Sequence, residues 1–152
     1  MAVKSKRKIV LASGVFDLLH LGHVRFLEEA KRAGDQNAKL IVIIARDSTA
    51  EKTKGRKPIM SEDQRRALVV SLKVVDEAVL GYEDLDIGEV IGKIKPDIIA
   101  LGYDQADMEK GVKSYLAKHK VPVEIVRISK FAENTLDSSS KIRQKIIDKL
   151  ST

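Results

Sequence analysis

Apolar and polar positions alternate in blocks along this 152-residue chain. Five short blocks rich in Ile, Val and Leu are typical of strands buried under helices. They cover residues 8–12, 39–45, 77–80, 97–101 and 123–128. Helical patterns follow them, at 22–33, 61–72, 87–94, 107–118 and 138–150. This order predicts an α/β fold: one domain, residues 1–152, with a doubly wound five-stranded parallel sheet and helices on both faces.

Local signals mark where some of these elements begin. Ser61 is followed three residues later by Gln64, which is the capping-box pattern of a helix N-terminus. Residues 46–59 are polar and lysine-rich and contain a glycine and a proline. That composition predicts a long loop between the second strand and the next helix.

The composition narrows the class of protein. Hydrophobic residues make up 43% and charged residues 33% of the chain, as in soluble globular proteins. The absence of cysteine excludes disulfides, thiolate metal sites and a thiol nucleophile. No apolar run approaches the about 20 residues that span a bilayer, and the basic first eight residues lack the apolar core of a secretory signal. We therefore expect a cytoplasmic protein without a membrane partner.

The net charge of +6 allows two interpretations. Surface lysines can serve solubility alone, or a positive cleft can attract small anionic molecules. Nucleic acid is not expected as a partner, because the basic residues are dispersed, aromatic residues make up only 4%, and no nucleic-acid-binding motif is visible.

The most informative stretch is residues 14–23, between the first strand and the first helix. It contains Gly14, which allows a tight turn, and the pair His20 and His23, which share one face once the helix begins. In open parallel sheets this junction presents backbone amides, here those of Val15 and Phe16, to phosphate. Imidazoles there can bind phosphate oxygens and, when protonated, neutralise developing charge. The stretch predicts in-line attack on a bound triphosphate.

Other interpretations of this stretch stay open. The histidines can simply cap a helix, or both can ligate a metal, although no third ligand is obvious nearby. A Rossmann dinucleotide site is not favoured, since Gly-x-Gly-x-x-Gly is missing after the first strand. We also consider that Asp17 helps to place His20 or a metal ion.

Three further segments have both a structural and a functional interpretation. Residues 52–57 form a basic stretch that is either solvated or contacts phosphate. In residues 101–105, Gly102 can admit a nucleotide and Asp104 can accept hydrogen bonds from a ribose or base, or cap a helix. The run Ser138, Ser139 and Ser140 can cap the last helix or bind phosphate, with Arg127 close in sequence. Of the pair 65–66 we expect one arginine to be solvated and the other to face substrate.

The run Ser-Gly-Val-Phe-Asp-Leu-Leu-His-Leu-Gly-His, residues 13–23, resembles the signature of the cytidylyltransferase-like nucleotidylyltransferase superfamily. Members of that superfamily share a Gly-Thr-Phe-Asp stretch and a His-x-Gly-His motif. Residues 45–47, 54–58, 64–66 and 101–105 are similar to the corresponding family segments, and the whole is most similar to the archaeal-type FAD synthases. Val15 stands where the family usually has Thr or Ser, so only a main-chain contact is carried over.

The resemblance implies transfer of AMP from ATP to FMN, giving FAD and pyrophosphate. It implies catalysis by His20, His23 and Lys54, with a divalent ion, Mg²⁺, accompanying the triphosphate and no separate metal site in the protein. It also implies a homodimer. The implied nucleotide-binding residues are Val15, Phe16, His20, Leu21, Gly22, His23, Gly102, Asp104, Arg127, Ser138, Ser139 and Ser140.

Two alternatives remain at this stage. The first is a glycerol-3-phosphate cytidylyltransferase, or a related enzyme with another phosphorylated acceptor. Such enzymes usually have Gly-Asp-Asp-Trp where this chain has Gly-Tyr-Asp-Gln at 102–105, which supports the flavin assignment. The second is a non-catalytic ATP-binding sensor domain, which would not need the two histidines.

Overall fold

Five parallel strands form one sheet in the computed structural model, which describes residues 6–83, 86–131 and 136–151. The strand order is β3-β2-β1-β4-β5, so the winding reverses between β1 and β4. In register, Val10 lies opposite Leu40 on one side and Ile98 on the other. The strands are β1 Ile9–Gly14, β2 Lys39–Ile44, β3 Glu77–Leu80, β4 Ile98–Gly102 and β5 Glu124–Ile128.

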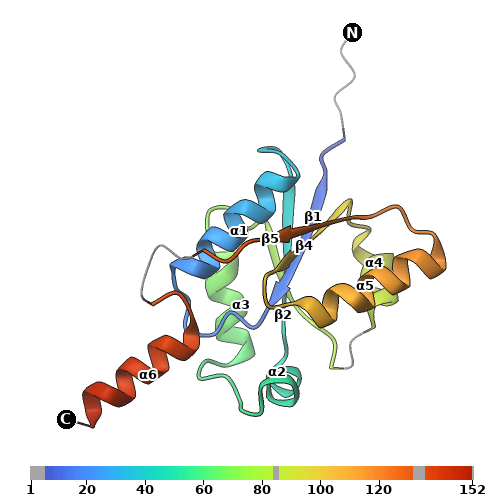
Figure 1. Cartoon of the computed structure of the whole chain (residues 1–152). Helices are drawn as coiled ribbons and strands as arrows, with labels where there is room; N and C mark the ends of the chain where they lie inside the picture. The colour runs from blue at the N-terminus through green and yellow to red at the C-terminus, as the bar shows by residue number, and fades with distance from the viewer. Residues whose placement is uncertain (1–5, 84–85, 132–135, 152) are drawn as a thin grey trace.

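Helices cover both faces of this sheet. They are α1 Leu21–Ala33, α2 Asp47–Lys54, α3 Glu62–Val70, α4 Ile87–Ile94, α5 Ala106–His119 and α6 Ser139–Leu150. Helices α1 and α3 pack on one face, and α4 and α5 on the other (Figure 1). Helices α2 and α6 lie beyond the carboxyl ends of the strands (Figure 1). The predicted doubly wound α/β fold is confirmed.

Alternation along the strands produces two cores. Val10 and Ala12 point toward α1 and α3, whereas Leu11 between them points toward α4 and α5. The same alternation holds along β2 and β4, which is why these strands are apolar at nearly every position. Among the described helices none is long and apolar enough to cross a bilayer.

The predicted loop over residues 46–59 is wrong in its first half, which forms α2. The sequence hides this helix because Ala50 is its single buried residue. A distant contact holds its start: the Asp47 amide donates to the Glu62 carboxylate (3.0 Å), and the Glu62 amide donates back to Asp47 (3.4 Å). Gly55 ends the helix at φ 77°, in the left-handed conformation that glycine tolerates.

Candidate active site

The loop after β1 turns through two residues other than glycine. Phe16 and Leu18 have φ values of 56° and 50°, in the left-handed region that side chains rarely adopt. Gly14 has a different role from the tight turn that we expected. A Cβ on Gly14 would lie 2.8 Å from the ring of the buried Phe16, so glycine is needed there to make room for that ring. The strained loop lies beside β4, at the point where the strand order reverses.

The two predicted histidines form a stacked pair at the start of α1. Their ring centroids are 3.8 Å apart and their planes differ by 27°. The backbone N–H of His20 donates to Nδ1 of His23 (3.3 Å), so Nδ1 carries no proton and Nε2–H of His23 is the free donor. Nδ1 of His20 is buried without a hydrogen-bond partner in the described residues. A Cβ on Gly22 would lie 2.8 Å from the His20 ring, so this glycine lets the ring lie against the first turn.

The environment keeps this pair uncharged. Burial, His20 and Lys54, in that order, lower the pKa of His23 to about 3, against the opposing effect of Asp17. Burial also lowers the pKa of His20, against the opposing effect of Asp137. Both rings are therefore neutral donors at physiological pH before substrate binds, rather than the charged imidazoles that the sequence led us to consider.

Asp17 connects three parts of the site. Its buried carboxylate accepts from the backbone amides of Ile59 (2.7 Å) and Met60 (2.9 Å), in the segment after α2. Arg143 of α6 lies 3.6 Å away, and the Ser139 hydroxyl donates to the Asp17 carbonyl. Asp17 therefore holds the basic segment and α6 against the loop after β1. That Asp17 also helps to place His20 or a metal ion stays a prediction; its carboxylate acts on His23, where it opposes the burial that lowers the pKa of that ring.

Arg65 performs a similar task from α3. Its side chain is fully buried, and it forms an ion pair with Asp47 at 2.6 Å. Its guanidinium also donates to three backbone carbonyls, those of Val15 (2.7 Å), Ala45 (2.9 Å) and Met60 (3.0 Å). Neither arginine of the pair follows our expectation fully, because Arg65 faces the protein interior and Arg66 is only half-buried.

The serine run meets the histidine loop at the start of α6. Ser138 is the N-cap, and its hydroxyl accepts from the Lys141 amide (3.2 Å). Ser140 accepts from Arg143 (3.4 Å). These hydroxyls are thus used within the protein, which leaves the amides of Ser139 and Ser140 as the first-turn donors open to phosphate.

Sequence reasoning missed Arg143. Its Nε is buried and has no partner in the described residues, directly beside Asp17. A buried donor without a partner is costly, so this atom fits an anion that arrives with substrate. The signal was present in the sequence, because Arg143 lies one helical turn after Ser139.

The turn after β4 is fixed to the end of β1. Oε1 of Gln105 accepts from the Gly102 amide (2.8 Å), and Nε2 donates to the Ser13 carbonyl (3.1 Å). Asp104 is exposed on this turn. The predicted pair Gly102 and Asp104 therefore lies at the same edge of the sheet as the histidine loop, beside the point of strand reversal.

The remaining predicted basic residues lie in different parts of the structure. Residues 52, 54, 56 and 57 are all exposed, but Lys54, at the end of α2, lies close enough to His23 to lower the pKa of that ring. Arg127 lies on the other face of the sheet, because Ile125, two residues before it, packs toward α4 and α5. It pairs there with Glu109 of α5. The structure does not bring Arg127 to the histidines.

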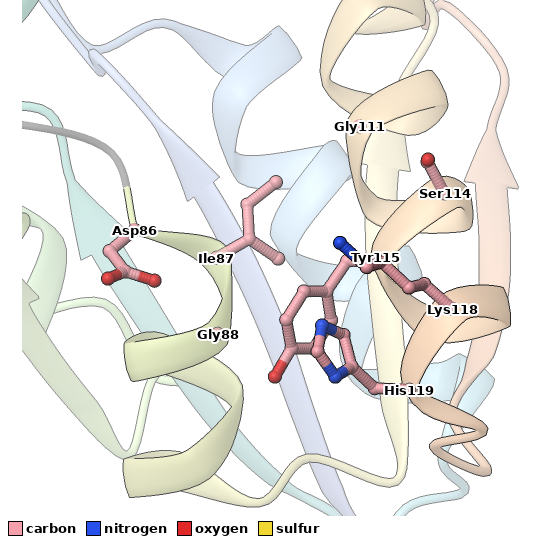
Figure 2. Close-up of a pocket in the computed structure, with 8 residues that line it drawn as sticks. All are labelled: Asp86, Ile87, Gly88, Gly111, Ser114, Tyr115, Lys118 and His119. Atoms are coloured by element: carbon pink, nitrogen blue, oxygen red, sulfur yellow. The ribbon is translucent and has the colours of Figure 1, made fainter.

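A shallow groove of about 530 Å³ lies elsewhere, between α4 and α5 (Figure 2). The ring of Tyr115 fills part of it, lying against Gly88, where a Cβ would be 2.9 Å from the ring. His119 packs on Tyr115 with ring centroids 4.3 Å apart. None of the lining residues is one that we predicted for the site, and the groove is separate from it.

The chain is similar to known proteins along most of its length. A family model described as cytidylyltransferase-like matches residues 11–145. The chain belongs to the cytidylyltransferase-like family. An FAD synthase from Aciduliprofundum boonei is 48% identical over 141 residues, which cover 93% of this chain and 91% of that protein. An FAD synthase from Ferroglobus placidus is 50% identical over 140 residues, which cover 92% and 88%.

Two solved structures are similar to this chain. A lipopolysaccharide core biosynthesis protein from Thermoplasma volcanium is 48% identical, with a TM-score of 0.75 over 84% of this chain and 100% of that chain. A pantoate–β-alanine ligase from Francisella tularensis is only 14% identical, with a TM-score of 0.63 over 95% of this chain and 67% of that chain. The second similarity concerns the fold alone.

Nucleotidyltransferases such as those of the cytidylyltransferase-like family commonly use a divalent metal ion. Among the described residues, however, no three His, Cys, Asp or Glu side chains gather into a group that could hold one. Asp17, a carboxylate within the loop after β1, accepts hydrogen bonds from two backbone amides.

Proposed function

We propose that this protein is an FMN adenylyltransferase, which transfers AMP from ATP to FMN and releases FAD and pyrophosphate. One observation carries the proposal. FAD synthases are 48% and 50% identical to this chain over more than nine-tenths of its length. The arrangement of stacked histidines, Lys54 and two helix N-termini at one sheet edge suits the chemistry of a triphosphate.

In the proposed reaction, a phosphate oxygen of FMN attacks the α-phosphorus of ATP. A new phosphoanhydride bond forms as the bond from the α-phosphorus to the bridging oxygen breaks, and pyrophosphate leaves with the electron pair. No covalent enzyme intermediate is needed, so the protein contributes positioning and electrostatic stabilisation. Nε2–H of His23 and the unpartnered Nδ1 of His20 would form hydrogen bonds with the reacting phosphates.

Negative charge should change the protonation of this pair. A bound triphosphate opposes the burial that lowers both pKa values, because an anion nearby favours the imidazolium form. Lys54, Arg143 and the first-turn amides of α6 would hold the β- and γ-phosphates. The amides of Leu21 and Gly22, at the start of α1, would hold oxygens closer to the α-phosphate.

The divalent ion, for which we propose Mg²⁺, would enter bound to the oxygens of ATP. Mg²⁺ is commonly held by substrate phosphates and water with few protein ligands. When bound, it would neutralise part of the phosphate charge.

An acceptor panel tests the function directly. The purified protein is incubated with ATP or CTP and with FMN, glycerol 3-phosphate or phosphopantetheine, and pyrophosphate and FAD are measured. We expect FAD only from ATP with FMN. Activity with another acceptor and none with FMN would overturn the assignment. His23→Ala separates an enzyme from an ATP sensor, because it should reduce turnover far more than ATP affinity.

We further propose a cytoplasmic homodimer in which residues 1–152 form one nucleotidylyltransferase domain, with no nucleic acid or membrane as a partner. Helix α6 supports the assembly, because none of its residues is buried and Ile146, Ile147 and Leu150 are exposed. The mass in solution tests it: light scattering should give twice the 16.9 kDa of one chain.

A further inference from the structure

One exposed aromatic side chain lies at the end of β4, beside the site. The chain has three tyrosines and three phenylalanines, all of them in the described part of the structure. Tyr103 alone among them is exposed, with 52% of its surface accessible. It lies directly after β4, at the strand end where ligands bind in open parallel sheets. About half of the ring surface at this position therefore stays open to a ligand.

The backbone that carries this ring is held in place. Tyr103 follows Gly102, whose amide is bound by the Gln105 side chain, and Gln105 is bound in turn to Ser13 at the end of β1. The turn is therefore fixed at both strand ends, on either side of the point of reversal. A fixed platform loses little conformational entropy when a ligand binds.

The surroundings of the ring link it to the phosphate-binding end of the site. Nζ of Lys130 lies 5.5 Å from the ring centroid, which is the geometry of a cation–π contact. Burial, Asp104 and Asp137 raise the pKa of the Tyr103 phenol, and Lys141 opposes them. Asp137 also acts on His20, and it directly precedes the N-cap of α6. One carboxylate is therefore close to both the ring and the histidine pair.

We propose that Tyr103 binds a planar heteroaromatic ring of a nucleotide substrate by stacking. Two rings of this chemistry reach the site if the proposed function holds, the adenine of ATP and the isoalloxazine of FMN, and the proposal rests on that function. Stacking of a base on an aromatic side chain tolerates different bases, because each has a π-face. If the stacked ring is the isoalloxazine, Tyr103 would also help to select FMN over an acceptor without a flat ring, such as glycerol 3-phosphate.

Two substitutions separate the ring from its hydroxyl group. Tyr103→Leu removes the aromatic face, and Tyr103→Phe retains it. Tyr115→Leu, in the separate groove between α4 and α5, is the control for loss of a tyrosine elsewhere. ATP affinity is measured by calorimetry. FMN affinity is measured by the quenching of flavin fluorescence, which stacking on tyrosine strengthens. Thermal unfolding of each variant verifies that it is folded.

We expect Tyr103→Leu to weaken binding of ATP or FMN by about 5- to 100-fold. Tyr103→Phe and Tyr115→Leu should stay within about twofold of the original protein. A loss confined to ATP identifies adenine as the stacked ring, and a loss confined to FMN identifies isoalloxazine. Unchanged affinity for both nucleotides in Tyr103→Leu overturns the proposal, as does an equal loss in Tyr103→Phe.

These binding measurements do not depend on turnover. If the acceptor panel yields no FAD but Tyr103→Leu still weakens nucleotide binding, the proposed function fails and the stacking role stands. If FAD forms and binding is insensitive to Tyr103, only the stacking role fails.

Discussion

Replacement of Arg65 by methionine tests how the site is held together. Methionine matches the length of the arginine stem but has neither charge nor donors. The substitution removes the ion pair with Asp47 and leaves the carbonyls of Val15, Ala45 and Met60 without their donor. These carbonyls belong to the loop after β1, the end of β2 and the segment after α2, so one side chain joins three parts of the active site.

The structure sets the size of the expected effect. A hydrogen bond from a charged group contributes about 1.5–3 kcal/mol, and removing one partner of a buried ion pair costs about 3–5 kcal/mol. The Asp47 side chain is 33% exposed and regains water in the variant, which favours the lower part of that range. We expect the free energy of unfolding to fall by about 3–4 kcal/mol. For a chain of this size, that corresponds to a loss of roughly 6–16 °C in Tm.

The matched control is Arg66→Met, on the same helix. Arg66 is half-buried and makes no hydrogen bond or ion pair in the described residues, so its loss should change stability by no more than about 0.5 kcal/mol. Urea unfolding followed by circular dichroism measures both variants, and the shift in midpoint gives the difference at constant m-value. Equal midpoints for Arg65→Met and Arg66→Met would refute the role that we assign to Arg65.

Two further predictions concern the reaction and the histidine pair. Lys54→Gln should lower kcat/KM by about 10²-fold or more, because a positive charge near the phosphates is lost. Lys52→Gln, on the same helix, is the control and should change kcat/KM little. Equal effects of the two substitutions in steady-state assays would contradict the choice of Lys54. The pKa of His23 is about 3 in the folded protein and 6.5 in the unfolded chain, so between these pH values the unfolded chain binds more protons at His23. The free energy of unfolding that neutral His23 contributes is therefore present above pH 6.5 and is lost as the pH falls toward 3. Urea unfolding across this range should show a smaller decline for His23→Gln, and an identical decline would contradict the assigned burial of His23.

The parts of the fold that depend on local pattern could be predicted, and those that depend on distant contacts could not. Apolar blocks locate all five strands within about two residues. Helix α2 escaped prediction because Glu62, fifteen residues after Asp47, stabilises its start. The face of Arg127 was predictable in principle, since strand alternation places it with Ile125 rather than with Val126.

The site shows the same division. Spacing alone places His20 and His23 together, but the tasks of Asp17 and Arg65 depend on distant partners, among them Ile59, Met60 and Val15 at 42, 43 and 50 positions away. From the sequence we considered that Asp17 helps to place His20 or a metal ion, and that one of Arg65 and Arg66 faces substrate. Burial commits Asp17 and Arg65 to backbone groups, since a buried charge must be paired and hydrogen-bonded to be tolerated.

The charge of the stacked histidines should depend on whether an anionic ligand is bound. Two imidazolium rings whose centroids are 3.8 Å apart repel each other, and burial adds to the cost of charging either one. A triphosphate reduces both penalties at once, because its charge offsets the repulsion and supplies the partner that Nδ1 of His20 lacks. The two imidazoles should therefore take up protons when ATP binds. Their protonation should be most favourable in the transition state, in which attack by FMN adds negative charge to the leaving pyrophosphate. Stabilisation of this kind is greater in the transition state than in the free enzyme, which is the condition for faster turnover rather than tighter binding alone.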